Sequence, residues 1–491
     1  MKDWAYKALP FVGVSLGFSV LGAIATAYSS LLPLLIVVAS CMVVRILKGE
    51  PLLLLFSAFL IPFTFDLPLP GGHNVGLPGE AVMLVLSGAW VLHYASKRTL
   101  STALFHPMIV AMVLFFGCLS WSTLWSSDDM VSRKTMFTQT MFMLAGFAAP
   151  CWLILTGKVN LFRWIEFLAI GLTLVSVYAL LNWAVSDPVT RSSSQMARPF
   201  YKDHTIFSAA NCLLMPVLFW LRSHQTTMLR KNIFTVAGVV CTAAVFLAAS
   251  RAAWISLLFA LALGFACRVK LKTPGFLSVA ALTVILVMLG LRPLERWALT
   301  NRNDSSRFQS SLKEQALSVA NITNDVSNLE RLNRWKCALR MVRDRPFTGY
   351  GPGTYQVAYL PYQRMSEMTR ISVVTPFYIK DGKGGTAHSE YFLLLAETGW
   401  PGLWAWLLLL IAVLYTAHRL SIMYANGPLR AFRQAVAIGL ATFWLHGLFN
   451  NFLTSANFAW LYWVMLATLF ILHIGKPSFA HEQYQSWRVN I

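Results

Sequence analysis

Charged residues are scarce in this sequence. Asp, Glu, Lys and Arg make up 12% of the 491 residues, and 57% of the residues are hydrophobic. A soluble domain has about a quarter charged residues, so this composition excludes an ordinary soluble protein. Most of the apolar runs reach the roughly 17–25 residues that a helix needs to cross a bilayer. We therefore predict an all-α polytopic membrane protein.

Acidic residues are the rarer of the charged types. The chain has 20 Asp and Glu against 40 Lys and Arg, which gives a net charge of +20. A basic surplus can indicate a nucleic-acid partner. Beside apolar runs of bilayer length, however, orientation signals and contacts with anionic lipids explain it better. We expect membrane lipids, and no nucleic acid, among the partners.

Motifs for metals, nucleotides and disulfides are missing. The seven cysteines show no C-x-x-C spacing, and no H-E-x-x-H or similar cluster occurs. The glycine-rich turn from Thr348 to Tyr355 lacks the Gly-Lys-Ser/Thr of a P-loop. No internal repeat is evident, so the symmetry of inverted-repeat transporters is not supported. The sequence predicts neither a metal nor a cofactor.

Apolar runs divide the chain into fourteen candidate membrane spans. The second, third, eighth and tenth are short or closely spaced, so we predict 12–14 transmembrane helices. The first run is longer than the apolar region of a signal peptide and is expected to remain as a membrane helix. The approximate limits are 8–28, 31–47, 51–67, 81–96, 107–125, 137–156, 165–184, 206–221, 233–250, 252–267, 274–291, 400–417, 433–449 and 457–473.

Lys and Arg gather in alternate loops, as the positive-inside rule expects of cytoplasmic loops. This pattern favours an even number of spans with both termini in the cytoplasm. The long polar segment then lies on the outer side, inserted before the last three helices. The predicted regions are an N-terminal transmembrane bundle at 1–291, a mostly helical outer loop domain at 292–387, C-terminal transmembrane helices at 388–475 and a cytoplasmic tail at 476–491.

Three segments keep arginines on the outer side, against the general pattern. Arg191 and Arg198 lie in segment 185–205, Arg251 opens the tenth span after a tight turn, and the outer loop domain holds several more. Guanidinium groups gathered at an outer membrane face suit a phosphate or pyrophosphate, which they grip with paired hydrogen bonds. The alternatives are a snorkelling anchor for Arg251 and contacts with lipid headgroups for the other two.

His388 follows a flexible Gly384-Gly385 pair at the point where the polar segment meets the next apolar run. Apolar spacing after it predicts a helix that stops at Gly399 and Pro401, with His388 in its first turn. The positive end of the helix dipole favours a neutral imidazole, which can accept a proton. A histidine hydrogen-bonded to backbone at a helix start is the structural alternative.

Four further residues are candidates for binding an acceptor or supporting the site: His204, Glu390, Tyr391 and Arg334. His204 precedes the eighth span and is equally compatible with a structural histidine. Glu390 does not share a helix face with His388 and is an uncertain partner for it. In the outer domain, Ser327 to Glu330 reads as a capping box.

The helix that follows this capping box should bury one stripe of apolar side chains. Leu332, Trp335, Leu339 and Val342 recur at helical spacing, and Asp344-Arg345-Pro346 ends the helix. Arg331, Arg334 and Arg340 lie away from that stripe.

Three strings together resemble the O-antigen ligase/polymerase superfamily. They are His388-Ser389-Glu390-Tyr391-Phe392, continued by Ala396-Glu397-Thr398-Gly399 and Pro401-Gly402-Leu403, then Asp344 to Gly353, and Ser250-Arg251-Ala252-Ala253-Trp254. The resemblance covers about 190–455, and it rests on the order, spacing and membrane setting of the strings. Ser389 stands where Asn is common in the family.

The resemblance implies a metal-independent, inverting glycosyltransferase of the GT-C-like kind in the bacterial inner membrane. Such enzymes take a glycan from undecaprenyl pyrophosphate on the periplasmic side. Ligases pass it to lipid A–core, polymerases pass it to another lipid-linked repeat unit, and related members pass it to protein. On this reading His388 is the base, and Arg251, Arg198 and, more weakly, Arg191 hold the pyrophosphate. A transporter of lipid-linked oligosaccharide is the rival class, although it leaves the large outer domain unexplained.

Overall fold

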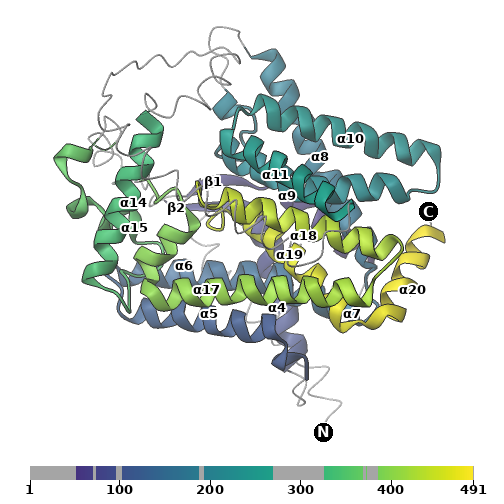
Figure 1. Ribbon diagram of the computed structural model, residues 1–491, viewed down its shortest axis with the longest axis horizontal. Helices are drawn as coiled ribbons and strands as arrows, with labels where there is room; N and C mark the ends of the chain where they lie inside the picture. Colours follow the sequence, from purple (N-terminus) through teal and green to yellow (C-terminus); the bar gives the residue numbers. More distant parts are fainter. Residues whose placement is uncertain are drawn as a thin grey trace, which may run out of the picture.

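A computed structural model of the chain describes residues 51–69, 73–95, 102–186, 193–268, 326–368, 372 and 385–489. These residues are mostly helical, and the long helices lie side by side. The described part of the predicted outer domain 292–387, here called the outer segment, lies at one end of them (Figure 1). Seven described helices are long and apolar enough to cross a membrane, and α4 and α11 are shorter apolar helices. The prediction of an all-α polytopic membrane protein is confirmed. The predicted spans 8–28, 31–47 and 274–291 lie outside the described residues.

The described helices of the bundle follow the predicted spans closely from residue 79 onward. Between residues 79 and 268 they are α4 (Gly79–Ala95), α5 (Pro107–Leu124), α6 (Asp129–Met143), α7 (Ala149–Leu155), α8 (Leu161–Val185), α9 (His204–His224), α10 (Met228–Leu247) and α11 (Arg251–Arg268). A π-helical turn, Leu144–Ala148, joins α6 to α7 without interruption. The later ones are α17 (Glu390–Met423), α18 (Pro428–His446), α19 (Ala456–Ile474) and α20 (Lys476–Val489).

Helix ends match local capping chemistry. Asp128, Asn160 and Asp203 are N-caps whose side chains accept backbone N–H groups of the first helical turn. Helix α20 occupies the region predicted as a tail. Its buried Trp487 donates Nε1–H to Glu166 of α8 over 3.0 Å.

The span predicted at 51–67 is wrong in its second half. Helix α3 (Pro51–Leu60) has only ten residues, and a 3₁₀ turn at Ile61–Phe63 follows it. Strand β1 (Phe65–Leu69) then pairs antiparallel with β2 (His73–Leu77). Proline inside an α-helix removes a hydrogen bond and clashes with the preceding turn, so Pro62 prevents α3 from continuing. The hairpin lies at the same end of the bundle as the outer segment (Figure 1).

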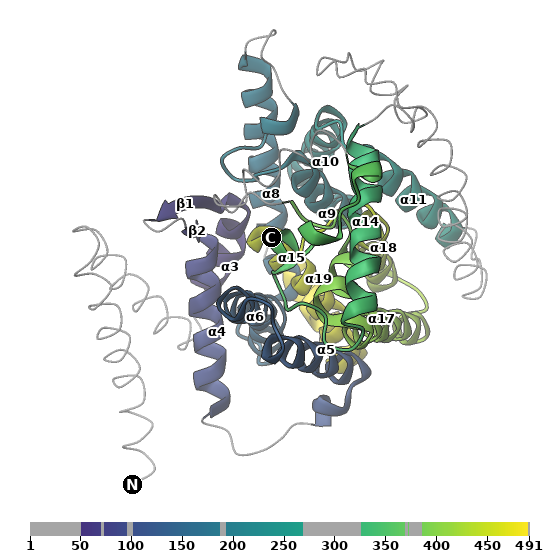
Figure 2. The same ribbon diagram turned by 90° about the vertical axis from the view of Figure 1, so that its left-hand side faces the viewer.

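Helix α19 forms the centre of the bundle. Nearly all its side chains are buried, and it packs against α17, α18, α9 and the α6–α7 region. Figure 2 shows α19 surrounded by the other helices, with α14 (Val326–Asp344) and α15 (Tyr355–Ala358) of the outer segment in front of them. The outer segment thus covers one end of a bundle that is already closed around α19.

Helix α17 changes direction at Gly399. This residue has φ 68° and ψ −167°, so the predicted break is present although helix resumes directly after it. A Cβ at Gly399 would lie 2.4 Å from the carbonyl oxygen of Pro346, and Trp400 donates its N–H to that oxygen over 2.8 Å. The outer segment therefore touches the kink itself.

The glycine-rich turn after α14 is fitted against the same part of α17. Gly349 has φ 62°, and a Cβ there would lie 2.2 Å from the carbonyl oxygen of Glu397. Gly351 donates its N–H to that oxygen over 2.9 Å, and Ser127 donates its N–H to the carbonyl oxygen of Tyr350 over 2.8 Å. The close backbone approach requires glycine and fixes the outer segment on the bundle.

We predict that Gly349→Ala weakens this docking, because the new methyl group meets backbone and the φ angle disfavours alanine. Alkylation of Cys337, which is fully buried in the outer segment, should become faster in purified protein. Gly117→Ala on α5 is the control, since a Cβ there meets nothing within 4 Å. Equal Cys337 protection in the two variants would contradict the prediction.

Candidate active site

The outer segment rests on the first part of α17. The ring of Trp335 from α14 stacks on Phe392 with centroids 5.2 Å apart. A small core lies beneath this contact, formed by Cys337, Ala338, Met341, Tyr355, Tyr359, Ala387, Leu393 and Ala396. The segment that leads into α17 is therefore held between α14, α15 and the bundle.

Arg334 faces this core, contrary to the predicted stripe. Its side chain is 2% exposed, whereas Leu339, expected to face inward, is 41% exposed. Glu330 lies one turn earlier on α14 and accepts from Arg334 Nε over 2.8 Å. Because this pairing satisfies the charge, the guanidinium can occupy the buried face that its hydropathy would otherwise exclude.

The guanidinium of Arg334 fixes the chain just before His388. Its Nη1 donates to the carbonyl oxygen of Thr386 over 2.8 Å. Tyr355 donates its hydroxyl to the carbonyl oxygen of Arg334 over 2.7 Å, which holds the helix backbone in place. Residues 385–389 form the linker that leads into α17. A Cβ at Gly385 would lie only 1.7 Å from Nη1, so glycine is needed where this linker passes the guanidinium.

His388 stands before the helix and not in its first turn. Ser389 is the N-cap of α17 and accepts the N–H of Phe392, so the predicted start of the helix was too early. The backbone of His388 has φ 50°, in the left-handed region that non-glycine residues seldom occupy. Such a conformation persists when the surroundings hold it, and it often marks a functional position.

The imidazole of His388 is neutral at ordinary pH. Burial lowers its pKa to about 3, and the positive charges of Arg334 and Arg331 act in the same direction. Asp203 opposes them. The neutral state agrees with the sequence prediction, but its causes are burial and two guanidinium groups, since His388 lies outside the helix.

Glu390 and Tyr391 join α17 to the loop after α18. The buried Glu390 carboxylate accepts the N–H groups of Phe452 and Leu453, the second over 2.9 Å. Tyr391 donates its hydroxyl to the carbonyl oxygen of Trp444 over 3.0 Å. These contacts fix the start of α17 on the loop after α18 and on the end of α18. The Glu390 carboxylate is used by this loop, so it is not oriented as a partner for His388.

Asp203 and His204 form the start of α9. Asp203 accepts the N–H of Thr205 over 2.8 Å, and His204 Nδ1 lies 3.0 Å from the same carboxylate oxygen. Burial alone would raise the pKa of Asp203, but these contacts hold it at about 2. The negative charge of Asp203 acts on His388, so this end of α9 contributes to the surroundings of the candidate base.

Of the three predicted pyrophosphate arginines, the structure describes Arg251 and Arg198, which lie at the start of α11 and in the segment before α9. Arg251 is the half-buried first residue of α11, after a turn in which Ala249 has φ 53°. Arg198 is exposed in the segment before α9, and its carbonyl oxygen accepts the Tyr178 hydroxyl over 2.8 Å. Arg191 lies outside the described residues.

Sequence reasoning missed the residues that hold the linker. Thr386 donates its hydroxyl to Asn451, and Ser389 donates its hydroxyl to the carbonyl oxygen of Gly447 over 3.3 Å. Their partners lie more than fifty residues away, so no local pattern reports them. Asp203 could have been found, since an Asp before an apolar helix is a typical N-cap.

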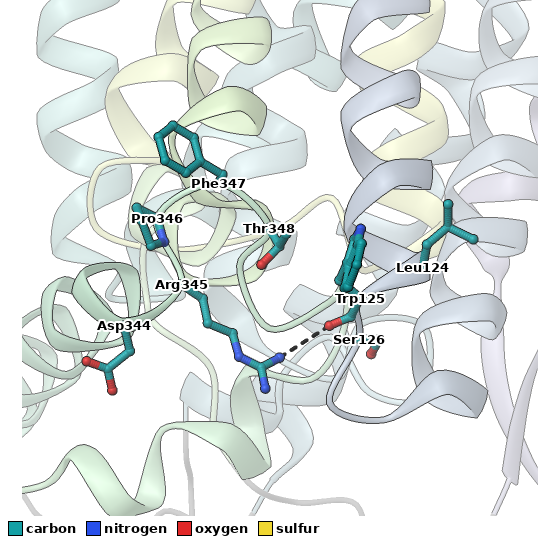
Figure 3. Close-up of a pocket in the computed structure, with 8 residues that line it drawn as sticks. All are labelled: Leu124, Trp125, Ser126, Asp344, Arg345, Pro346, Phe347 and Thr348. Atoms are coloured by element: carbon teal, nitrogen blue, oxygen red, sulfur yellow. Dashed lines mark hydrogen bonds between the residues drawn. The ribbon is translucent and has the colours of Figure 1, made fainter.

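A separate pocket of about 490 Å³ lies beside the kink of α17, between the end of α5 and the turn that follows α14 (Figure 3). Arg345 donates Nη1–H to the carbonyl oxygen of Trp125 over 3.2 Å and stacks on Tyr350 at 4.6 Å. Nine residues of helix separate Glu390 from the kink, a rise of about 14 Å. The pocket therefore does not include His388.

Within the described ranges, no group of three or more His, Cys, Asp or Glu residues is placed to hold a metal ion.

We predict that Arg334→Met disrupts both stability and activity, because it removes the guanidinium that pairs with the buried Glu330 carboxylate. Losing one partner of a buried pair costs about 3–5 kcal/mol, whereas replacing both with apolar residues is often neutral. The double variant Arg334→Met/Glu330→Leu should regain the thermal unfolding temperature in detergent. Its turnover should remain low, because the linker before His388 is no longer held. Full activity in the double variant would contradict this role.

A search of curated proteins finds no match. Residues 236–407 match a family model described as O-Antigen ligase, a stretch that runs from α10 through the outer segment and past the kink of α17. The match includes Arg251, Arg334 and His388, and members of this family are glycosyltransferase-like O-antigen ligases or polymerases. The matched domain agrees with the resemblance to the O-antigen ligase/polymerase superfamily that the sequence motifs show.

Proposed function

We propose that this protein transfers a glycan from undecaprenyl pyrophosphate to an acceptor at the periplasmic face of the bacterial inner membrane. The favoured acceptor is lipid A–core, which makes the protein an O-antigen ligase. The observation that carries the proposal is His388, which is neutral, held in a left-handed backbone conformation and placed where the outer segment meets the bundle. The active site then faces the periplasm and both termini are cytoplasmic.

In the proposed reaction the acceptor hydroxyl attacks the anomeric carbon of the donor sugar. The new C–O bond forms as the bond to the pyrophosphate breaks, and the configuration at that carbon inverts. His388 takes the hydroxyl proton, and undecaprenyl pyrophosphate leaves with the bonding electron pair. General base catalysis of this kind typically contributes about 10²–10⁴ in rate.

Arg251 and Arg198 are proposed to hold the pyrophosphate, with Arg191 as a weaker candidate. Two guanidinium groups can stabilise the charge on the leaving group through paired hydrogen bonds, without a metal. Arg334 has a different proposed role, because its guanidinium is already bonded to Glu330 and Thr386. It positions the linker, and its positive charge adds to the burial that keeps His388 neutral.

The direct test is transfer by purified protein in detergent with a lipid-linked glycan and an acceptor. Product made without a second compartment or a membrane potential supports the enzyme, whereas movement across vesicles without product would indicate a transporter. Lipopolysaccharide from a deletion strain separates the two enzymes. Undelivered long chains on the lipid carrier indicate a ligase, and a core that bears a single repeat unit indicates a polymerase.

We predict that Arg251→Ala and Arg198→Ala each weaken donor binding and lower kcat by about 10²–10³, the usual loss for one donor to a developing anion. Arg133→Ala is the control, because Arg133 is exposed and pairs with Asp129 on its own helix. Donor affinity measured in detergent should be unchanged in that control. Wild-type donor affinity in both test variants would remove the pyrophosphate role from these residues.

The pH dependence should differ between the free and the occupied enzyme. In the free protein the lowered pKa of His388, about 3, leaves the base deprotonated throughout the measurable range. Hence kcat/KM should show no acid limb from this group near pH 6.5. A bound pyrophosphate brings negative charge and raises the pKa, so the acid limb of kcat should lie at higher pH. Coincident acid limbs in the two profiles would contradict this account.

A further inference from the structure

His446 and Asn450 are two buried polar residues at the end of α18. His446 is the last residue of the helix and is 1% exposed, and Asn450 is 5% exposed. The N–H of Asn450 donates to the carbonyl oxygen of His446 over 3.2 Å, so the two residues lie one turn apart. Phe452 meets the imidazole edge-to-face with centroids 4.8 Å apart.

The polar atoms of this pair are not satisfied. Neither ring nitrogen of His446, nor Nδ2 of Asn450, has a hydrogen-bond partner in the part of the chain that the structure describes. Buried polar groups without partners are costly, and each one in a native structure requires an explanation. The neighbouring carboxylate of Glu390 shows the contrast, because it accepts two backbone N–H groups.

The residue that follows His446 contacts the chain next to His388. Gly447, which follows His446, accepts the N–H of Glu390 over 2.9 Å and the hydroxyl of Ser389 over 3.3 Å. The charged and titratable groups that act on the His446 ring are Arg331, Asp203 and His204, and the first two also act on His388. Gly447 therefore ties the end of α18 to the backbone next to the candidate base.

We infer that His446 and Asn450 form a subsite that binds the hydroxyl groups of the sugar transferred in the reaction for which His388 is the proposed base. A neutral imidazole offers one donor and one acceptor, and an amide nitrogen offers two donors, which matches adjacent hydroxyls. An uncharged set of this kind suits a sugar ring, whereas the guanidinium groups suit the pyrophosphate. Because the pair is nearly inaccessible in the free protein, the subsite opens as the sugar binds. This inference rests on the proposed function.

The test uses His446→Phe, which keeps the size and the aromatic contact but removes both nitrogens. The unfolding temperature in detergent should be unchanged or higher, and kcat/KM for the donor should fall at least about tenfold. His446→Gln, which keeps a donor and an acceptor, should recover part of the loss. Asn457→Leu is the control for stability. Asn457 is also buried but bonds to Phe200 and Thr64, so its loss should lower the unfolding temperature.

A second measurement separates loss of sugar binding by His446 from a change in side-chain packing, because it varies the donor sugar and leaves each protein unchanged. Donors that lack single hydroxyls of the transferred sugar should react more slowly with the wild-type protein, and at least one such deficit should disappear in His446→Phe. Equal deficits in both proteins, or wild-type kcat/KM in a stable His446→Phe variant, would overturn the subsite. Absence of product from the wild-type protein would instead contradict the proposed function.

Discussion

The buried pair between Arg334 and Glu330 organises the contact between α14 and the linker that leads into α17. One guanidinium ties α14 to the chain two residues before His388, and the same positive charge helps to keep that histidine neutral. A charge this deeply buried is tolerated only while its partners are in place. The same contact therefore holds the chain next to the proposed base and adds to the effect of burial on its pKa.

Three segments distant in sequence meet around this contact. The linker 385–389 is braced on one side by the outer segment and on the other by the loop after α18, through Ser389, Glu390 and Thr386. The start of α9 brings the negative charge of Asp203 to the same place. In the proposed reaction, this junction is where a membrane-held donor meets an acceptor brought by the outer segment.

Sequence patterns predicted the membrane helices well, because the length of an apolar run is a local signal. The N-caps Asp128 and Asn160 start two helices at Asp129 and Leu161, earlier than the predicted 137 and 165, because the first turns of these helices are less apolar than the rest. Arg334 was assigned to the outer face of α14, because hydropathy ignores a charge satisfied by Glu330 four residues earlier. His388 was placed inside the helix, although Ser389 is the better cap. The contacts to Gly447 and Asn451 could not be read, since they depend on the packing of distant segments.

The central claim is that His388 removes the proton from the acceptor hydroxyl. Its most direct test is single-turnover transfer by purified His388→Ala protein from a lipid-linked donor, with and without added imidazole. The account predicts a rate lower by about 10²–10⁴ that imidazole partly restores, with donor binding retained. A His388→Ala variant that transfers glycan at the wild-type rate would contradict it.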